Sequence, residues 1–215
     1  MKFYKLLAVA AVLLYTSCSI TQEYHFNNDF SGNYTFEMNM GDMISMLQSM
    51  DTTGAFNSLD TLDQSFEQIR NEYNNAGAKE VEVGWKNDKT TVFIAFKFDN
   101  IESLNTILAN SSNDFNMYSG GTQNGKTNFT KKGKNILVMD FPETSKDTAV
   151  VSSMAGMQDY LTIETIFSFD RAIKSTSNSG GTISEDKKSI KFEGKAEDLL
   201  KDGYTMDSQI KLKRK

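Results

Sequence analysis

The segment LTIETIFSF, residues 161–169, alternates apolar and polar side chains along its whole length. The residues that share one face are Leu161, Ile163, Thr165, Phe167 and Phe169. A period of two residues is typical of a strand with one buried face. This segment therefore predicts a sheet with one face in the core.

The same alternation, or a short run rich in β-branched and aromatic residues, recurs on both sides of this segment. The further predicted strands lie at residues 31–40, 81–85, 91–98, 128–131, 135–141, 173–176, 189–193 and 204–212. Asn87-Asp88-Lys89 is a hairpin turn between two of them, and Gly180-Gly181 lies in a turn between two others. The sequence thus predicts about eight or nine strands.

Apolar residues spaced three and four apart predict helices between these strands. The predicted helices lie at about residues 42–50, 59–73, 101–108 and 148–158. Most connections are short, which favours a curved, mainly antiparallel sheet with the helices packed on one face. The predicted fold class is α+β.

The N-terminus has the three zones of an export signal. Lys2 and Lys5 are followed by the apolar run Leu6–Tyr15 and by the small residues Thr16 and Ser17. This order is typical of a secretory signal peptide, here residues 1–17. The apolar run is about half the roughly 20 residues that cross a bilayer as a helix, so we expect no permanent transmembrane segment.

The only cysteine, Cys18, stands where this signal would be cut. The arrangement resembles the bacterial lipoprotein signal, although Tyr15 stands where that family usually has Leu. The resemblance implies that Cys18 carries palmitate-type acyl chains and becomes the new N-terminus. Ser19 replaces the Asp of the inner-membrane retention signal, so the implied location is the cell envelope, with a lipid anchor in the outer membrane.

Residues 19–30 are polar with scattered aromatic rings. We interpret residues 18–30 as the lipidated cysteine and a tether, and residues 31–215 as a single α+β domain. The single histidine, His25, falls in the predicted tether and is interpreted as a linker residue. Asn27, Asp29 and Ser31 resemble the start of a calcium-binding loop, but Met38 occupies the position that requires a bidentate Glu.

Composition excludes several classes of function. The formal net charge of −5 disfavours nucleic-acid binding, which needs clustered cations. One basic run, residues 211–215, is interpreted as a solvated strand end. A chain without a second cysteine forms no internal disulfide and no zinc–thiolate cluster. No catalytic, metal-binding or cofactor-binding motif is present, so we expect a protein that is not an enzyme and needs no cofactor.

Two non-enzymatic functions remain open. The stripe Met43, Met46, Leu47 and Met50 either fills the core or lines a groove for a lipid or another hydrophobic envelope ligand. The alternative is a structural scaffold that contacts an envelope protein partner through its acidic surface and the polar loop 110–128. A continuous cavity between sheet and helices favours the first function, and a solid core favours the second.

The segment Tyr160–Lys213 resembles the LppM-like envelope lipoprotein domain, an uncharacterised family. The residues that carry the resemblance are a strand ending at Phe169, Ile173-Lys174-Ser175, Asn178, Ser184-Glu185-Asp186, Ile190 and Phe192. The resemblance covers about a quarter of the chain and implies no catalytic residue. The wider layout is similar to lipid-carrier lipoproteins of the LolA and LppX type, an architectural analogy.

Overall fold

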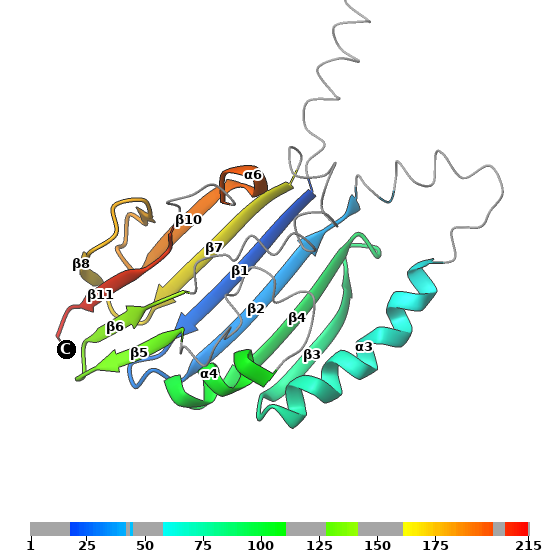
Figure 1. Cartoon of the computed structure of the whole chain (residues 1–215), viewed down its shortest axis with the longest axis horizontal. Helices are drawn as coiled ribbons and strands as arrows, with labels where there is room; N and C mark the ends of the chain where they lie inside the picture. The colour runs from blue at the N-terminus through cyan, green and yellow to red at the C-terminus, as the bar shows by residue number, and fades with distance from the viewer. Residues whose placement is uncertain are drawn as a thin grey trace, which may run out of the picture.

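The computed structural model describes residues 18–41, 44, 58–110, 128–141, 161–199 and 205–214. The α+β class is confirmed: the described chain forms eleven strands in two sheets, with helices (Figure 1). The helices are α3 (Ser58–Asn75), α4 (Ile101–Asn110) and the four-residue α6 (Ala196–Leu199). The expected signal peptide and the expected helix at 148–158 lie outside the described residues, as does the helix at 42–50 apart from Ile44.

The larger sheet has seven strands in the order β3-β4-β2-β1-β7-β10-β9. Their bounds are β3 Lys79–Lys86, β4 Thr91–Phe98, β2 Gly32–Asn39, β1 Cys18–Phe26, β7 Leu161–Phe169, β10 Ser189–Lys195 and β9 Thr182–Ile183. Neighbouring strands are antiparallel except β1 and β7, which run parallel along nine residues. The sheet is therefore mixed around one parallel pair.

The smaller sheet has four antiparallel strands in the order β5-β6-β11-β8. Their bounds are β5 Phe129–Lys132, β6 Ile136–Met139, β11 Ser208–Leu212 and β8 Ile173–Thr176. The expectation of a single sheet of eight or nine strands is wrong in this respect. β8 and β10 flank the same turn region in the sequence but belong to different sheets, because β8 pairs with β11 and β10 pairs with β7.

The expected tether over residues 18–30 is also wrong. Residues 18–26 form β1, which lies fourth of seven in the larger sheet. It pairs with β7 over its whole length and with β2 from Ser19 to Phe26. Residues 27–31 form the tight turn to β2, closed by a hydrogen bond from the backbone N–H of Asn27 to the carbonyl of Ser31 (2.8 Å). Residues 18–30 therefore belong to the folded unit and do not form a tether.

One face of the larger sheet forms the core. On β1 the even-numbered residues from Ile20 to Phe26 are buried, while Ser19, Thr21, Glu23 and His25 on the opposite face are half-buried. The apolar face is covered by α3, α4 and the smaller sheet. Three ring contacts fix these layers, with centroid distances of 5.6 Å for Phe66–Trp85, 5.1 Å for Tyr73–Phe96 and 5.2 Å for Tyr24–Phe129.

Local sequence explains both longer helices. α3 buries Phe66, Ile69 and Tyr73, which are three and four residues apart and so share one face. α4 begins at a capping box, in which the Asn100 side chain accepts from the Ser103 backbone and the Ser103 hydroxyl accepts from the Asn100 backbone. These helices match the segments predicted from apolar spacing.

Candidate functional site

A glutamine lies in the middle of the apolar face. Gln22 on β1 is fully buried and is aligned with Phe36 on one side and Thr165 on the other. The residues aligned with one another across β3, β4, β2, β1, β7 and β10 at this level are Val83, Ile94, Phe36, Gln22, Thr165 and Phe192. A primary amide is thus placed where its neighbours along and across the sheet are mostly aliphatic or aromatic.

Among the residues that the structure describes, the Gln22 amide has no hydrogen-bond partner at either its nitrogen or its oxygen. Two residues along the same face, the hydroxyl of Tyr24 is likewise buried and without a partner. The Tyr24 ring contacts Tyr34, Phe129 and Phe167, with centroid distances of 4.9, 5.2 and 5.2 Å. Burial, and then the nearby Tyr73, raises the pKa of Tyr24 well above its ordinary value of 10.0. The phenol therefore stays a neutral donor and acceptor.

Buried polar groups in folded proteins are almost always hydrogen-bonded, because an unpaired one loses its interaction with water without compensation. The Gln22 amide offers two donors and one acceptor oxygen, and the Tyr24 hydroxyl offers one of each. Chemically, the pair can hold a polar group that enters an otherwise apolar environment. A few polar groups set in apolar walls are typical of small-molecule sites.

Cys18, the residue predicted to carry the lipid, is the first residue of β1 and is aligned with Leu161 of β7. Its thiol is not in a disulfide, and the side chain is half-buried against the core. The modification itself is not tested by this geometry. The position places any acyl chain on Cys18 directly at the end of the larger sheet.

The candidate groove residues Met43, Met46, Leu47 and Met50 lie outside the described residues. Their described neighbours Met40 and Ile44 are buried. Of the loop 110–128, only the two end residues are described. Both of these predictions therefore stay predictions.

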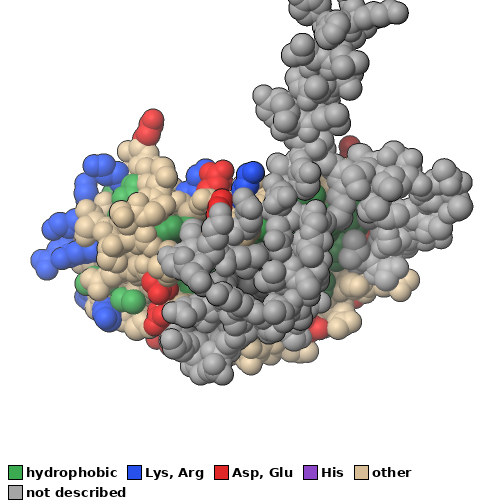
Figure 2. Space-filling view, turned by 45° about the horizontal axis from the view of Figure 1, so that its top comes forward, with side chains coloured by type: hydrophobic (Ala, Val, Ile, Leu, Met, Phe, Trp, Pro, Cys, Tyr) green, Lys and Arg blue, Asp and Glu red, His purple; other side chains and the backbone are tan. Residues whose placement is uncertain are grey.

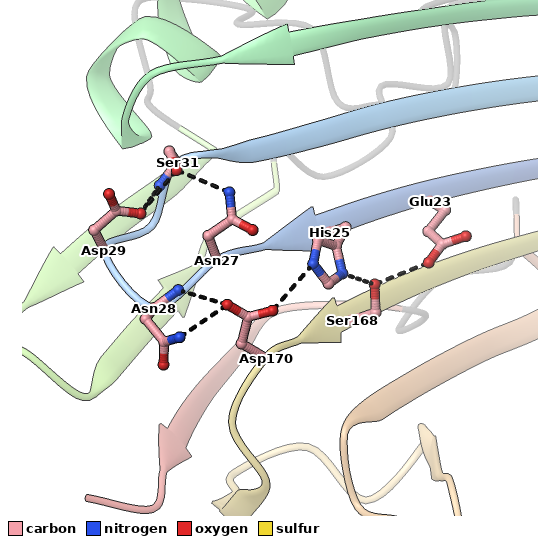
Figure 3. A network of polar contacts seen from close by, with 8 residues as sticks. All are labelled: Glu23, His25, Asn27, Asn28, Asp29, Ser31, Ser168 and Asp170. Atoms are coloured by element: carbon pink, nitrogen blue, oxygen red, sulfur yellow. Dashed lines mark hydrogen bonds and ion pairs between the residues drawn. The ribbon is translucent and has the colours of Figure 1, made fainter. Parts of the chain in front are cut away.

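His25 belongs to a polar network on the other face of the larger sheet (Figure 3). Its Nδ1 lies 3.0 Å from the Ser168 Oγ, which in turn donates to the Glu23 carboxylate at 2.8 Å. Its Nε2 lies 3.5 Å from Asp170 Oδ1, and Asp170 also accepts from the backbone and side chain of Asn28. The interpretation of His25 as a linker residue is therefore wrong.

The residue types in this network are those of a serine hydrolase triad, but the geometry is different. In such a triad the imidazole Nε2 faces the serine, and Nδ1–H faces the aspartate. Here Nδ1 faces Ser168, Nε2 faces Asp170, and the serine hydroxyl is a donor to Glu23. The network links β1 to β7 and to the turn after β7. Sequence reasoning missed it because the partners of His25 are more than 140 residues away.

The described part of the chain contains neither a cluster of metal-ligating side chains nor a helix that could span a membrane. No group of three or more His, Cys, Asp or Glu residues there is placed to hold a metal ion. Asp29 and Ser31, in the calcium-loop resemblance, instead bond to each other, with the Ser31 hydroxyl donating to Asp29 at 2.8 Å. Among the same residues, no helix has both the length and the apolar character needed to cross a membrane.

Comparison with known proteins gives a structural similarity and no sequence match. No family model matches the chain, and no curated protein matches it in sequence. The folded domain of LppM from Mycobacterium tuberculosis, determined by NMR, is similar with a TM-score of 0.44 and 13% sequence identity. The similarity covers 91% of this chain and 89% of that domain. Similarity at this level concerns the fold and assigns neither a family nor a function.

Proposed function

We propose that this protein is a non-enzymatic, lipid-anchored binding module of the cell envelope. Its ligand is hydrophobic, carries one polar group and lies against the apolar face of the larger sheet. The observation that supports this function is a pair of buried polar groups on β1, the Gln22 amide and the Tyr24 hydroxyl, which have no hydrogen-bond partner in the described part of the chain.

The physical argument concerns the protein without ligand. An amide that is buried without a partner destabilises the fold by about 1–3 kcal/mol in mutational data. A ligand that brings an ester, amide, hydroxyl or carboxyl group to Gln22 supplies the missing hydrogen bonds. Its apolar part meets aromatic and aliphatic side chains, such as Phe36 and Phe167, that already form this face. Ligand binding therefore stabilises the folded protein, because it gives hydrogen bonds to polar groups that folding alone leaves unpaired.

The anchor follows from the sequence together with the position of Cys18. In our proposal residues 1–17 are a signal peptide, Cys18 carries the acyl chains, and the outer membrane is the destination. Because Cys18 is already part of β1, no tether separates the lipid from the fold. The end of the larger sheet that contains Cys18 then lies at the membrane surface.

The anchor is tested with Cys18→Ser. The variant should lose metabolic labelling with a fatty acid and should appear either as uncleaved precursor or in the soluble fraction. A cysteine that carries several acyl chains holds a protein stably on a membrane, whereas a single chain holds it only marginally. Continued labelling, or full recovery of the variant with the membranes, would show that this anchor is wrong.

The ligand is tested by native mass spectrometry of the purified full-length protein in mild detergent. Wild type should carry an additional mass of lipid size, which Gln22→Leu should lose. Gln209→Leu is the matched control, since it makes the same chemical change at an exposed position on β11. Equal ligand occupancy in wild type and Gln22→Leu would contradict the proposed site. A ligand-free wild type that co-purifies with one envelope protein at fixed stoichiometry supports the scaffold alternative instead.

A further inference from the structure

Eight cations gather at one end of the molecule, which we call the basic end. They come from β5 and its turn to β6, from the segment after β7, from β8, and from β11 and the residues that follow it. The residues are Lys131, Lys132, Lys134, Arg171, Lys174, Lys211, Lys213 and Arg214. Figure 2 shows Lys and Arg side chains gathered at the end where Figure 1 places β11 and the C-terminus. The basic run 211–215 seen in the sequence is thus only part of a larger cluster.

The charge of the basic end contrasts with the rest of the chain. Among the described residues that line this surface, Asp29 is the one carboxylate, so these residues carry a net charge of +7. Because the whole chain has a net charge of −5, the remainder carries −12. Several lysines of the larger sheet are paired with carboxylates, for example Lys86 with Glu37 and Lys191 with Glu164. Among the described residues, none of the eight cations makes an ion pair with a carboxylate.

Two adjoining hollows lie among these cations, with volumes of about 610 and 780 Å³. Both are lined by Lys134, Asn135 and Arg214, so a molecule that fills one hollow can continue into the other. The total space is much larger than a single phosphate or carboxylate needs. The shape therefore suits an extended ligand with several anionic groups.

The chain holds part of this surface in place before any ligand arrives. The Arg171 guanidinium donates to Asn135 Oδ1 at 2.6 Å and to the Lys134 carbonyl at 3.0 Å. Its Nε has no hydrogen-bond partner among the described residues. Arg171 and Lys131 both lie over the ring of Phe30, at 5.6 and 5.3 Å from its centroid. Phe30 is buried and has a φ of 69°, a conformation that bulky residues rarely adopt. Strain of this kind is found most often at functional sites.

We propose that the basic end binds a chain-like polyanion that carries phosphate groups. Six of the eight cations are lysines, which act as point charges towards phosphate rather than as bidentate forks. The described residues that line the two hollows include no aromatic side chain, and the ring of Phe30 beneath Lys131 and Arg171 is buried. No ring is therefore available there for stacking on bases, which disfavours nucleic acid. Like charges this close repel one another, and a bound polyanion removes that repulsion.

The basic end also lies away from Cys18. Cys18 and the turn that contains Asn28 and Asp29 are at opposite ends of β1, a nine-residue strand of about 30 Å at roughly 3.3 Å per residue. Electrostatic attraction is screened over about 8–10 Å at physiological ionic strength. A membrane that holds Cys18 therefore does not attract the basic end, which favours a polymer as its ligand. This step rests on the proposed anchor at Cys18, whereas the charge and the hollows of the basic end depend neither on acylation nor on the ligand of the larger sheet.

The test measures binding of fluorescently labelled polyphosphate to the purified full-length protein by fluorescence anisotropy over a range of NaCl concentrations. Wild type should bind, and its affinity should fall as salt rises, because binding releases counterions. Lys132→Glu/Lys211→Glu should weaken binding by about tenfold or more, since both residues flank Ile136 on the exposed side of the smaller sheet. The matched control Lys188→Glu/Lys195→Glu has the same net charge and should stay within about twofold of wild type.

Far-UV circular dichroism and thermal melting of both double variants show that the fold is retained, which is expected because all four lysines are exposed. Equal loss of binding in the two variants would overturn the proposal, since it would indicate attraction by net charge alone. Tighter binding of single-stranded DNA of equal charge would also overturn it. So would binding to phosphatidylcholine vesicles that contain phosphatidylglycerol without any binding of polyphosphate.

Discussion

Replacement of Gln22 by leucine should stabilise the ligand-free protein. Most substitutions of a fully buried residue destabilise a protein, so an increase in stability is a demanding prediction. We expect it here because both polar atoms of the Gln22 amide are buried and have no hydrogen-bond partner among the residues described. The aligned residues Phe36 and Thr165 on the neighbouring strands are also buried. Leucine has a similar volume and brings no group that needs a hydrogen bond.

The size of the effect follows from the amide. Leaving a buried donor and acceptor unpaired costs about 1–3 kcal/mol, and the substitution removes that cost. The free energy of unfolding should therefore rise by about 1–3 kcal/mol, less any cost of refitting the branched side chain. For a chain of this size, each kcal/mol corresponds to an increase in Tm of about 2–4 °C.

The assay is chemical denaturation of protein from which lipid has been extracted, followed by the fluorescence of the single tryptophan, Trp85. Gln209→Leu, the exposed control, should change the free energy of unfolding by no more than about 0.5 kcal/mol. When extracted lipid is added back, wild type should gain stability as ligand binds the folded state. Gln22→Leu should gain much less.

A loss of stability in Gln22→Leu would refute this reasoning. If the free energy of unfolding falls by about 1 kcal/mol or more while the Gln209→Leu control is unchanged, the amide is hydrogen-bonded in the native protein. Gln22 would then be a structural residue, and the hydrophobic-ligand function would lose the observation that supports it.

Three further predictions concern titration and packing. Burial raises the pKa values of Tyr24 and Tyr34, so these phenols should ionise only when the protein unfolds. The stability that they contribute is fully present below pH 10.0 and should be lost as the pH rises further. Titration followed by ultraviolet absorbance measures this ionisation. Hydrogen bonds from Lys89 and then Trp85 hold the pKa of Asp63 below its ordinary value of 3.8. The stabilising effect of Asp63 should therefore persist above that value and be lost as pH falls, with a change in Trp85 emission centred below pH 3.8. Asn105→Ala removes two buried hydrogen bonds to β5 and should lower the free energy of unfolding by about 2–4 kcal/mol in urea denaturation.

The elements with an unbroken period could be predicted from the sequence. Residues 161–169 alternate without interruption and form β7, and the apolar spacing of residues 59–73 corresponds to α3. The division into two sheets could not be predicted in this way. β8 and β10 both have strand-like composition, but their partners are chosen by contacts with β11 and β7 that no local pattern records. The parallel pairing of β1 with β7 is equally non-local, and the network around His25 depends on it.

The failure at β1 has a more specific cause. Along its buried face, Ile20, Tyr24 and Phe26 follow the expected alternation, and only Gln22 interrupts it. Because of this one polar residue, the sequence pattern predicts a polar tether instead of a strand. Leucine at this position would restore the alternation of apolar and polar residues. It would also stabilise the fold, because its side chain needs no hydrogen bond. Local patterns and folded structures disagree most often at functional sites, where a residue is kept for what it binds. Gln22 is therefore both the residue that prevents prediction of β1 from the sequence and a residue that does not stabilise the fold.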